Sequence, residues 1–242
     1  MGKLLQQLFG QKDTPPAQAY DLWAAAYDLQ PNNLMLALDE TVFSELLGAV
    51  HIKEKVVVDI GCGTGRHWEK ILEKGPISLT GYDVSEKMLE LLQQKFPPAI
   101  THLLRDDRLN ETPDASVDVV ISTLTIAHIE KVETAMTEWD RVLKPGGFIL
   151  ITDYHPEALQ KGGKRTFTHN GKTVSVKNHI HSIKKLEAIA GQLHWQSLRL
   201  VEKAVDETVK AYYERERALN VFESFKGSLI IYGLLFKKKD AT

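Results

Sequence analysis

Val56-Val57-Val58-Asp59-Ile60-Gly61-Cys62-Gly63-Thr64-Gly65 is the stretch that decides the fold of this chain. The β-branched residues predict a buried parallel strand, and the alternating glycines after them predict a tight turn. The residues from Arg66 to Leu72 then begin a helix. Glycine is needed in such a turn because a side chain would keep the backbone from lying against a ligand. The stretch therefore predicts a strand, a ligand-binding turn and a helix.

The charge of Asp59 indicates which ligand the turn binds. A helix N-terminus offers unpaired N–H groups and a partial positive charge. The carboxylate just before the turn, however, disfavours a pyrophosphate and favours a ligand with an ammonium group. The dinucleotide pattern Gly-x-Gly-x-x-Gly would also need glycine where Arg66 stands. We therefore expect a nucleoside that carries an amino acid; a tight connection without a ligand is the alternative.

A second strand is predicted from Ile77 to Tyr82 and ends on Asp83, before a helical pattern from Glu86 to Phe96. A carboxylate at the end of this strand can accept hydrogen bonds from both ribose hydroxyls of a nucleoside. Each such bond contributes about 1.5–3 kcal/mol. The alternative is that Asp83 caps the following helix, a role that Ser85 also suits.

Together these segments resemble the class I S-adenosylmethionine-dependent methyltransferases. The resemblance is close over about residues 19–153 and looser elsewhere. Its specificity comes from the order and separation of several motifs. These are Val57–Gly65, Asp83, Arg105–Asp107, Ser116–Ser122 and Arg141–Ile151.

The resemblance implies S-adenosylmethionine as the cofactor and assigns residues to its parts. The glycine loop lies under the methionine part, Asp83 binds the ribose, and Asp106 accepts from the adenine amino group. A tyrosine-rich segment folds over the cofactor in this family, although the aromatic stripe near the N-terminus also suits core packing. The expected cofactor contacts are Asp59, Gly61, Gly63, Gly65, Asp83, Val84, Asp106, Asp107, Ser122, Tyr20 and Tyr27.

The order of elements predicts an α/β fold, a Rossmann-like doubly wound sheet with helices on both faces. The resemblance implies that the sheet is mostly parallel with an antiparallel last strand. We expect a single methyltransferase domain over residues 1–242. Its expected parts are a helical cap (1–50), a cofactor-binding core (51–153), a hairpin insertion (154–181) and a C-terminal part (182–242) with an inserted helix (207–221).

Asn170-Gly171 lies between two short strand patterns and predicts a β-hairpin over about residues 165–176. The hairpin follows the fifth strand, and open α/β sheets bind ligands at the carboxyl ends of their strands. We therefore expect it to act as a lid over the acceptor pocket. The alternative is that the hairpin only extends the fold.

Methyl transfer from a sulfonium depends mostly on in-line positioning and exclusion of water, which supply up to about 7–11 kcal/mol. An oxygen or carbon acceptor usually also needs a general base, and histidine suits this role with a pKa of about 6.5. His155, directly after the fifth strand, is the first candidate. His128, beyond the fourth strand, is the second, with a structural role as its alternative. His169, His179 and His181 match no recognised metal-ligand spacing, so no metal site is expected.

Composition narrows the classes further. The chain has 242 residues, of which 43% are hydrophobic and 26% charged, as in ordinary globular proteins. A net charge of −2 argues against a nucleic-acid partner, and no apolar run of the sequence reaches membrane-spanning length. The single cysteine, Cys62, excludes an internal disulfide and suits the cytoplasm.

The sequence therefore predicts an enzyme that methylates an oxygen or carbon of a small, partly apolar molecule. The place after the fourth strand holds Ser122-Thr123-Leu124-Thr125, not the Asn/Asp-Pro-Pro-Tyr-like motif of enzymes that methylate amino groups of bases or glutamine. A resemblance to quinone-biosynthesis and trans-aconitate methyltransferases supports the small-molecule acceptor. A non-catalytic cofactor-binding or regulatory protein and a nicotinamide-dependent oxidoreductase are the alternatives. The identity of the acceptor and the oligomeric state stay open.

Overall fold

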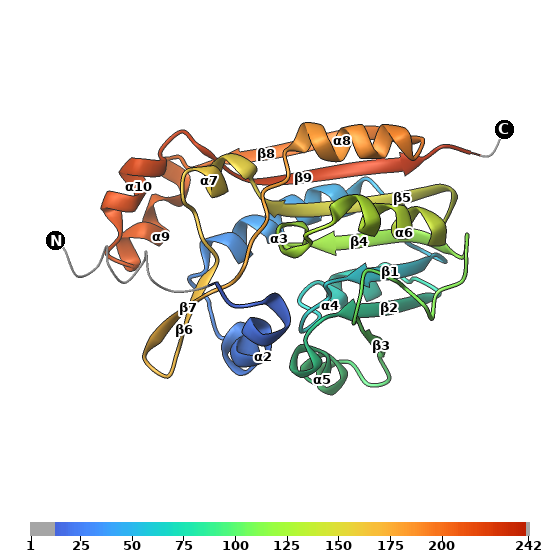
Figure 1. Cartoon of the computed structure of the whole chain (residues 1–242), viewed down its shortest axis with the longest axis horizontal. Coiled ribbons are helices and arrows are strands. Elements are labelled where there is room, and N and C mark those ends of the chain that lie inside the picture. The colour runs from blue at the N-terminus through green and yellow to red at the C-terminus, as the bar shows by residue number, and fades with distance from the viewer. Residues whose placement is uncertain (1–12, 241–242) are drawn as a thin grey trace.

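The computed structural model describes residues 13–240, and its centre is a seven-stranded sheet in the order β3-β2-β1-β4-β5-β9-β8 (Figure 1). The strands are β1 (Val56–Ile60), β2 (Ser78–Asp83), β3 (Ile100–Leu103), β4 (Val117–Thr123), β5 (Leu143–Tyr154), β8 (Trp195–Ala204) and β9 (Leu229–Lys238). β9 runs antiparallel to both of its neighbours, and the other adjacent strands are parallel. The expected Rossmann-like sheet with an antiparallel last strand is confirmed.

Helices cover both faces of this sheet (Figure 1). α3 (Leu34–Gly48), α4 (Trp68–Leu72) and α5 (Glu86–Lys95) pack on one face, and α6 (Val132–Val142) and α8 (Ile183–Gln192) pack on the other. Within β1, Val57 belongs to the first core and Val58 to the second. Successive side chains of a strand point to opposite faces, so a run of β-branched residues fills both cores.

A helix before the first strand and a hairpin after the fifth strand lie outside the central sheet. α2 (Pro16–Tyr27) packs along α5, and the hairpin of β6 (Thr166–His169) and β7 (Lys172–Ser175) packs on α2 (Figure 1). Between them Phe167 stacks on Trp23, with ring centroids 4.5 Å apart and planes 7° from parallel. The hairpin expected from Asn170-Gly171 is confirmed, with positive φ at both turn residues.

The inserted helix expected over residues 207–221 is broken into three pieces. They are the short 3-10 helix η2 (Glu207–Val209), α9 (Lys210–Arg215) and α10 (Leu219–Phe225). Arg217 has a φ of 53°, which no residue inside a right-handed helix can adopt, so the chain turns there. No helix among residues 13–240 is long and apolar enough to cross a bilayer.

Candidate functional site

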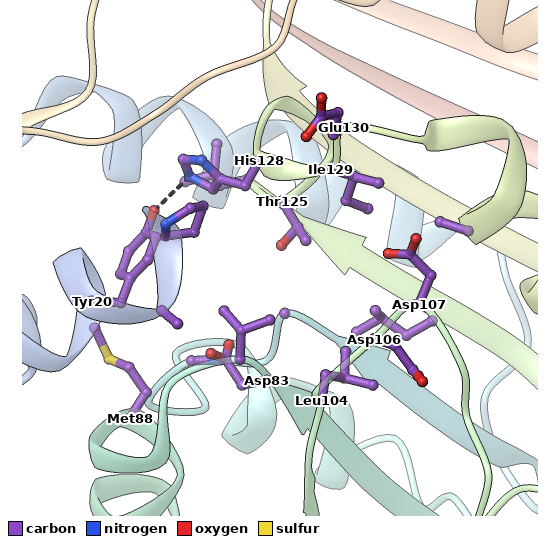
Figure 2. Close-up of a pocket in the computed structure, with 18 of the residues that line it drawn as sticks. Tyr20, Asp83, Met88, Leu104, Asp106, Asp107, Thr125, His128, Ile129 and Glu130 are labelled. Carbon is purple, nitrogen blue, oxygen red and sulfur yellow. Dashed lines mark hydrogen bonds between the residues drawn. The ribbon is translucent and has the colours of Figure 1, made fainter. Parts of the chain in front are cut away.

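A pocket of about 490 Å³ lies at the carboxyl ends of β1, β2 and β4 (Figure 2). The order of the sheet reverses between β1 and β4, and open α/β sheets bind ligands at such a point. The volume lies within the range of small-molecule and cofactor sites. The walls come from α2, the glycine loop, the ends of β2 and β4, and the segments before α5 and α6.

The glycine loop forms part of the wall because two of its glycines face the pocket. Gly61 has a φ of 72°, and a Cβ there would lie 2.0 Å from the Oγ1 atom of Thr125. Gly61 therefore lets the loop after β1 lie against the loop after β4. Gly63 also lines the pocket, whereas Gly65 packs against Leu92 and Phe96 and does not. The expected cofactor contact of Gly65 stays a prediction that the pocket wall does not support.

Asp83 is buried at the end of β2 and lines the pocket (Figure 2). Its Oδ2 atom accepts a 2.8 Å hydrogen bond from the backbone nitrogen of Gly63, and Oδ1 accepts one of 2.8 Å from that of Ser85. Burial raises the pKa of Asp83 to about 6. The side chain of Ser85, not Asp83, caps α5 by accepting from the backbone nitrogen of Met88. Asp83 is therefore free for a ligand at its remaining lone pairs.

Asp59 is buried in β1, just before the glycine loop, and is not part of the pocket wall. Its Oδ2 atom accepts a 2.9 Å hydrogen bond from the indole nitrogen of Trp68. The Oδ1 atom is buried without a hydrogen-bond partner among the described residues. Burial raises the pKa of this carboxyl to about 6. The side chain therefore joins β1 to Trp68 of α4 and keeps one oxygen without a partner among the described residues.

The opposite end of the pocket is formed by Val84, Leu104, Asp106 and Asp107. Figure 2 shows the two acids beside Leu104, across the pocket from Tyr20. Oδ1 of Asp106 accepts a hydrogen bond of 3.0 Å from the backbone nitrogen of Arg108. Partial burial, and then the charge of Asp106, raise the pKa of Asp107. These expected residues do meet in one pocket.

Ser122 does not line the pocket, so the structure does not support its expected cofactor contact. Its side chain is fully buried in β4 and its Oγ has no partner among the described residues. The next three residues, Thr123, Leu124 and Thr125, line the pocket instead. Leu124 has a φ of 52°, so the chain turns toward the pocket only after the strand has ended.

Tyr20 and His128 meet at the α2 side of the pocket (Figure 2). The Tyr20 hydroxyl lies 2.9 Å from Nε2 of His128, and Nδ1 of His128 lies 3.0 Å from the carbonyl oxygen of Lys177. Burial and the charge of Arg165 hold the pKa of His128 well below its usual range. The imidazole is therefore neutral. Tyr27, also expected near the cofactor, lines the same pocket.

Arg165 is a buried cation that contacts both Tyr20 and His128. No motif of the sequence predicted a functional role for it. Its Nη1 atom lies 2.6 Å from the Tyr20 hydroxyl and 2.6 Å from the carbonyl oxygen of Leu124, and it also contacts Nε2 of His128. Nη2 lies 3.3 Å from Asp153. Tyr20 and Arg165 are 145 positions apart, so no local pattern predicts this contact.

His155 does not line the pocket, so the structure does not support its expected role as a general base. Its Nδ1 atom accepts a 3.1 Å hydrogen bond from the backbone nitrogen of Glu157, which caps α7 (Pro156–Gln160). Its Nε2 atom lies 3.1 Å from Glu202. Both nitrogens therefore have structural partners. The proline that follows begins α7, so His155 stands at the N-cap of this helix.

The hairpin does not act as the expected lid by direct contact, because no residue of β6 or β7 lines the pocket. It instead supports α2, which does line the pocket, through the stack of Phe167 on Trp23. The ring of His181 donates a 2.7 Å hydrogen bond to the carbonyl of Ile129, beside the pocket. Among residues 13–240 no group of three metal-ligating side chains is placed to hold a metal ion.

Known proteins share this domain and this fold. A family described as a methyltransferase domain matches residues 58–151. A malonyl-[acyl-carrier protein] O-methyltransferase from Serratia marcescens is 32% identical over 149 residues, which are 61% of this chain and 55% of that protein. The chain spans about half the length of the curated relatives it matches (48% and 55% for two of them).

Solved structures extend the similarity to most of the chain. An S-adenosylmethionine-dependent methyltransferase from Mesorhizobium loti has a TM-score of 0.63 and 17% identity, over 81% of this chain and 96% of that chain. A phosphoethanolamine N-methyltransferase from Haemonchus contortus, solved with S-adenosylhomocysteine, has a TM-score of 0.60 and 16% identity, over 91% of this chain and 57% of that one. At these identities the likeness establishes the fold.

Proposed function

We propose that this chain is a class I S-adenosylmethionine-dependent methyltransferase that moves a methyl group from that cofactor to an oxygen or carbon of a small, partly apolar molecule; the methyltransferase-domain match over residues 58–151 supports this. The observation that carries the proposal is the position of Asp83. Its carboxylate lines a pocket at the point where the strand order of the sheet reverses. It also accepts a hydrogen bond from the backbone nitrogen of Gly63 in the glycine loop. A ribose bound there meets a charged acceptor that the fold has already oriented.

The residues present fit S-adenosylmethionine along the whole pocket. Asp83 has lone pairs left for the ribose hydroxyls, and Asp106 and Asp107 stand where an adenine amino group would donate. Leu104 and Trp139 supply an apolar wall for the base. The negative charge of Asp59, buried in β1 just before the glycine loop, favours an ammonium group on the ligand without direct contact, because Asp59 does not line the pocket.

S-Adenosylmethionine supplies an activated methyl group, so the protein's own part is to bind, orient and exclude water. Pro15, Pro16 and Tyr20 bring α2 over the pocket and reduce access of water. His128 is neutral, but the Tyr20 hydroxyl already contacts its Nε2 atom. We therefore assign the rate mainly to positioning, and propose that His128 orients Tyr20 rather than acting as a free general base.

An oxygen or carbon acceptor is supported by the residues after β4. Thr123, Leu124 and Thr125 line the pocket and offer no Pro-Pro-Tyr segment for holding an amino group. The relative from Serratia marcescens is described as an O-methyltransferase. Apolar side chains form much of the pocket wall, and such a wall suits a partly apolar acceptor. A protein that binds the cofactor without catalysis is the second candidate, because the same pocket would serve it.

The test combines binding with turnover. Calorimetry with S-adenosylhomocysteine and with NAD compares the two cofactor classes, and a panel of small hydroxyl, carboxyl and activated-carbon compounds is then screened for release of S-adenosylhomocysteine. Asp83→Ala serves as the binding-deficient control. Tight binding of NAD alone would contradict the proposal. Binding of S-adenosylhomocysteine without turnover on any acceptor would favour the non-catalytic alternative.

A further inference from the structure

We infer that Arg165 fixes the direction of the hydrogen bonds at Tyr20, so that this end of the pocket accepts a hydrogen bond from a hydroxyl or amino group of the bound ligand. Arg165 is thus a positioning residue that acts through Tyr20. The inference about ligand choice rests on the proposed function. The inference about hydrogen-bond direction concerns the protein alone.

The first step is the tautomer of His128. A carbonyl oxygen can only accept, so the 3.0 Å contact with Lys177 requires a hydrogen on Nδ1. In a neutral ring Nε2 then carries a lone pair and can only accept. Two groups lie close enough to donate to that lone pair, the Tyr20 hydroxyl at 2.9 Å and Nη1 of Arg165.

The second step is the arginine. A guanidinium only donates, and Nη1 has two hydrogens. Its two contacts of 2.6 Å, to the Tyr20 oxygen and to the Leu124 carbonyl, use both of them. Nη1 also contacts Nε2 of His128, so it has three acceptor neighbours for its two hydrogens. All three acceptors receive a hydrogen only when the Tyr20 hydroxyl donates to Nε2. Tyr20 accordingly accepts from Arg165 and donates to His128.

The third step concerns what is left on Tyr20. Its only hydrogen is donated to His128, and one of its lone pairs accepts a hydrogen bond from Arg165. A phenolic oxygen keeps one further acceptor site, and Tyr20 lines the pocket. Burial also raises the pKa of this phenol, so the hydroxyl stays protonated and the arrangement persists. A ligand carboxylate or carbonyl oxygen placed here would meet a lone pair, whereas a hydroxyl or amino group would be bound.

The hairpin gives the arrangement its rigidity. Arg165 begins the hairpin segment, is buried, and is also held by Asp153, whose carboxylate lies 3.3 Å from Nη2. The guanidinium lies over the ring of Tyr154, with its carbon 4.7 Å from the ring centroid. These contacts orient the planar fork, so a lysine cannot reproduce them.

The direction of the bonds is tested on the ligand-free protein. Nitrogen NMR of the histidine-labelled full chain, with His128 assigned by loss of its signal in His128→Asn, reports which ring nitrogen carries the hydrogen. We expect the neutral Nδ1–H form near neutral pH. Arg165→Met should raise the pKa of His128, because it removes a neighbouring positive charge, and Arg165→Lys should only partly restore it. Lys164→Met, at an exposed lysine that pairs with Asp13 at 3.5 Å, is the matched control and should leave the His128 signal unchanged. An Nε2–H form, a charged ring, or identical spectra in Arg165→Met and the wild type would overturn the inference.

Ligand choice is tested with Tyr20→Phe and two probes, S-adenosylhomocysteine and 5′-methylthioadenosine, which lacks the amino-acid part. A loss of about tenfold for the first probe alone identifies the cofactor amino group as the donor. Unchanged affinity for both, with a raised KM for the acceptor found by screening, identifies an acceptor hydroxyl or amino group. An equal loss for both probes would overturn the inference, since the hydroxyl would then act through the fold. Failure of the wild type to bind either probe would instead contradict the proposed function and leave the NMR result standing.

Discussion

The backbone nitrogen of Gly63 donates to the carboxylate of Asp83 at 2.8 Å, and this bond joins the glycine loop to the end of the neighbouring strand. One side chain thereby shapes the loop and faces the pocket. Asparagine at this position would keep an acceptor for Gly63 but lose the charge, whereas alanine would lose both. Comparison of the two substitutions therefore measures each contribution.

Asp83→Ala should weaken binding of S-adenosylhomocysteine by about 2–4 kcal/mol, because two ribose hydrogen bonds to a charged acceptor are lost. Asp83→Asn should fall between the alanine variant and the wild type. Calorimetry measures the affinity, and circular dichroism checks that the variants fold. Asp114→Ala, at an exposed surface acid, is the control. Unchanged affinity in a folded Asp83→Ala would remove the ribose assignment.

The affinity for S-adenosylhomocysteine should fall as pH falls through about 6. Burial raises the pKa of Asp83 to about 6, so acid converts its carboxylate into a neutral group that accepts hydrogen bonds less well. Each protonated group costs at most about tenfold in affinity per pH unit below its pKa. Asp59 has a pKa of about 6 as well, so Asp83→Asn should remove only part of the dependence. A flat profile in the wild type from acid to neutral pH would count against both carboxylates as ligand groups.

His155→Ala should lower stability and leave cofactor binding unchanged. The variant loses the cap of α7, which costs about 1 kcal/mol, and the contact with Glu202. His155→Asn should be milder, because asparagine is a good N-cap. Thermal unfolding and calorimetry measure the two effects, with the exposed His51→Ala as the control. A large loss of turnover in a stable His155→Asn would restore the catalytic role that the structure argues against.

Phe167→Ala should loosen α2 although the residue does not touch the pocket. Removing a buried aromatic ring costs about 3 kcal/mol, and here the loss falls on the stack with Trp23. Hydrogen exchange in α2 should rise, and the affinity for S-adenosylhomocysteine should fall because Tyr20 and Tyr27 lie on that helix. Thr168→Ala, exposed on the same strand, is the comparison. Faster exchange in the hairpin alone would show that α2 is held by other contacts.

The sequence predicted the parts of this protein that depend on local pattern. The β-branched run, the spacing of Gly61 and Gly63, and the position of Asp83 follow from strand and turn geometry within a few residues. The chain's agreement with a known order of motifs then supplied the topology of the sheet. Asp106 and Asp107 were found in the same way.

The errors come from contacts between distant segments. Whether His155 faces the pocket depends on the helix that Pro156 begins and on Glu202 from another strand. Arg165 carries no motif, and its role exists only because the hairpin folds back on α2. Ser122 was misplaced because the strand runs one residue further and the turn follows at Leu124.

The contact between Tyr20 and Arg165 spans 145 positions, and this separation sets an order on assembly. During synthesis α2 leaves the ribosome long before the hairpin that supports it. Strands β1 to β5 need no part of the hairpin to pair, whereas α2 finds the partner of Trp23 only after Phe167 has been made. Contacts of such separation form late because the chain between them must first be ordered. The part of the pocket at Asp83 and Asp106 can therefore form together with the sheet, and the part at Tyr20 forms last.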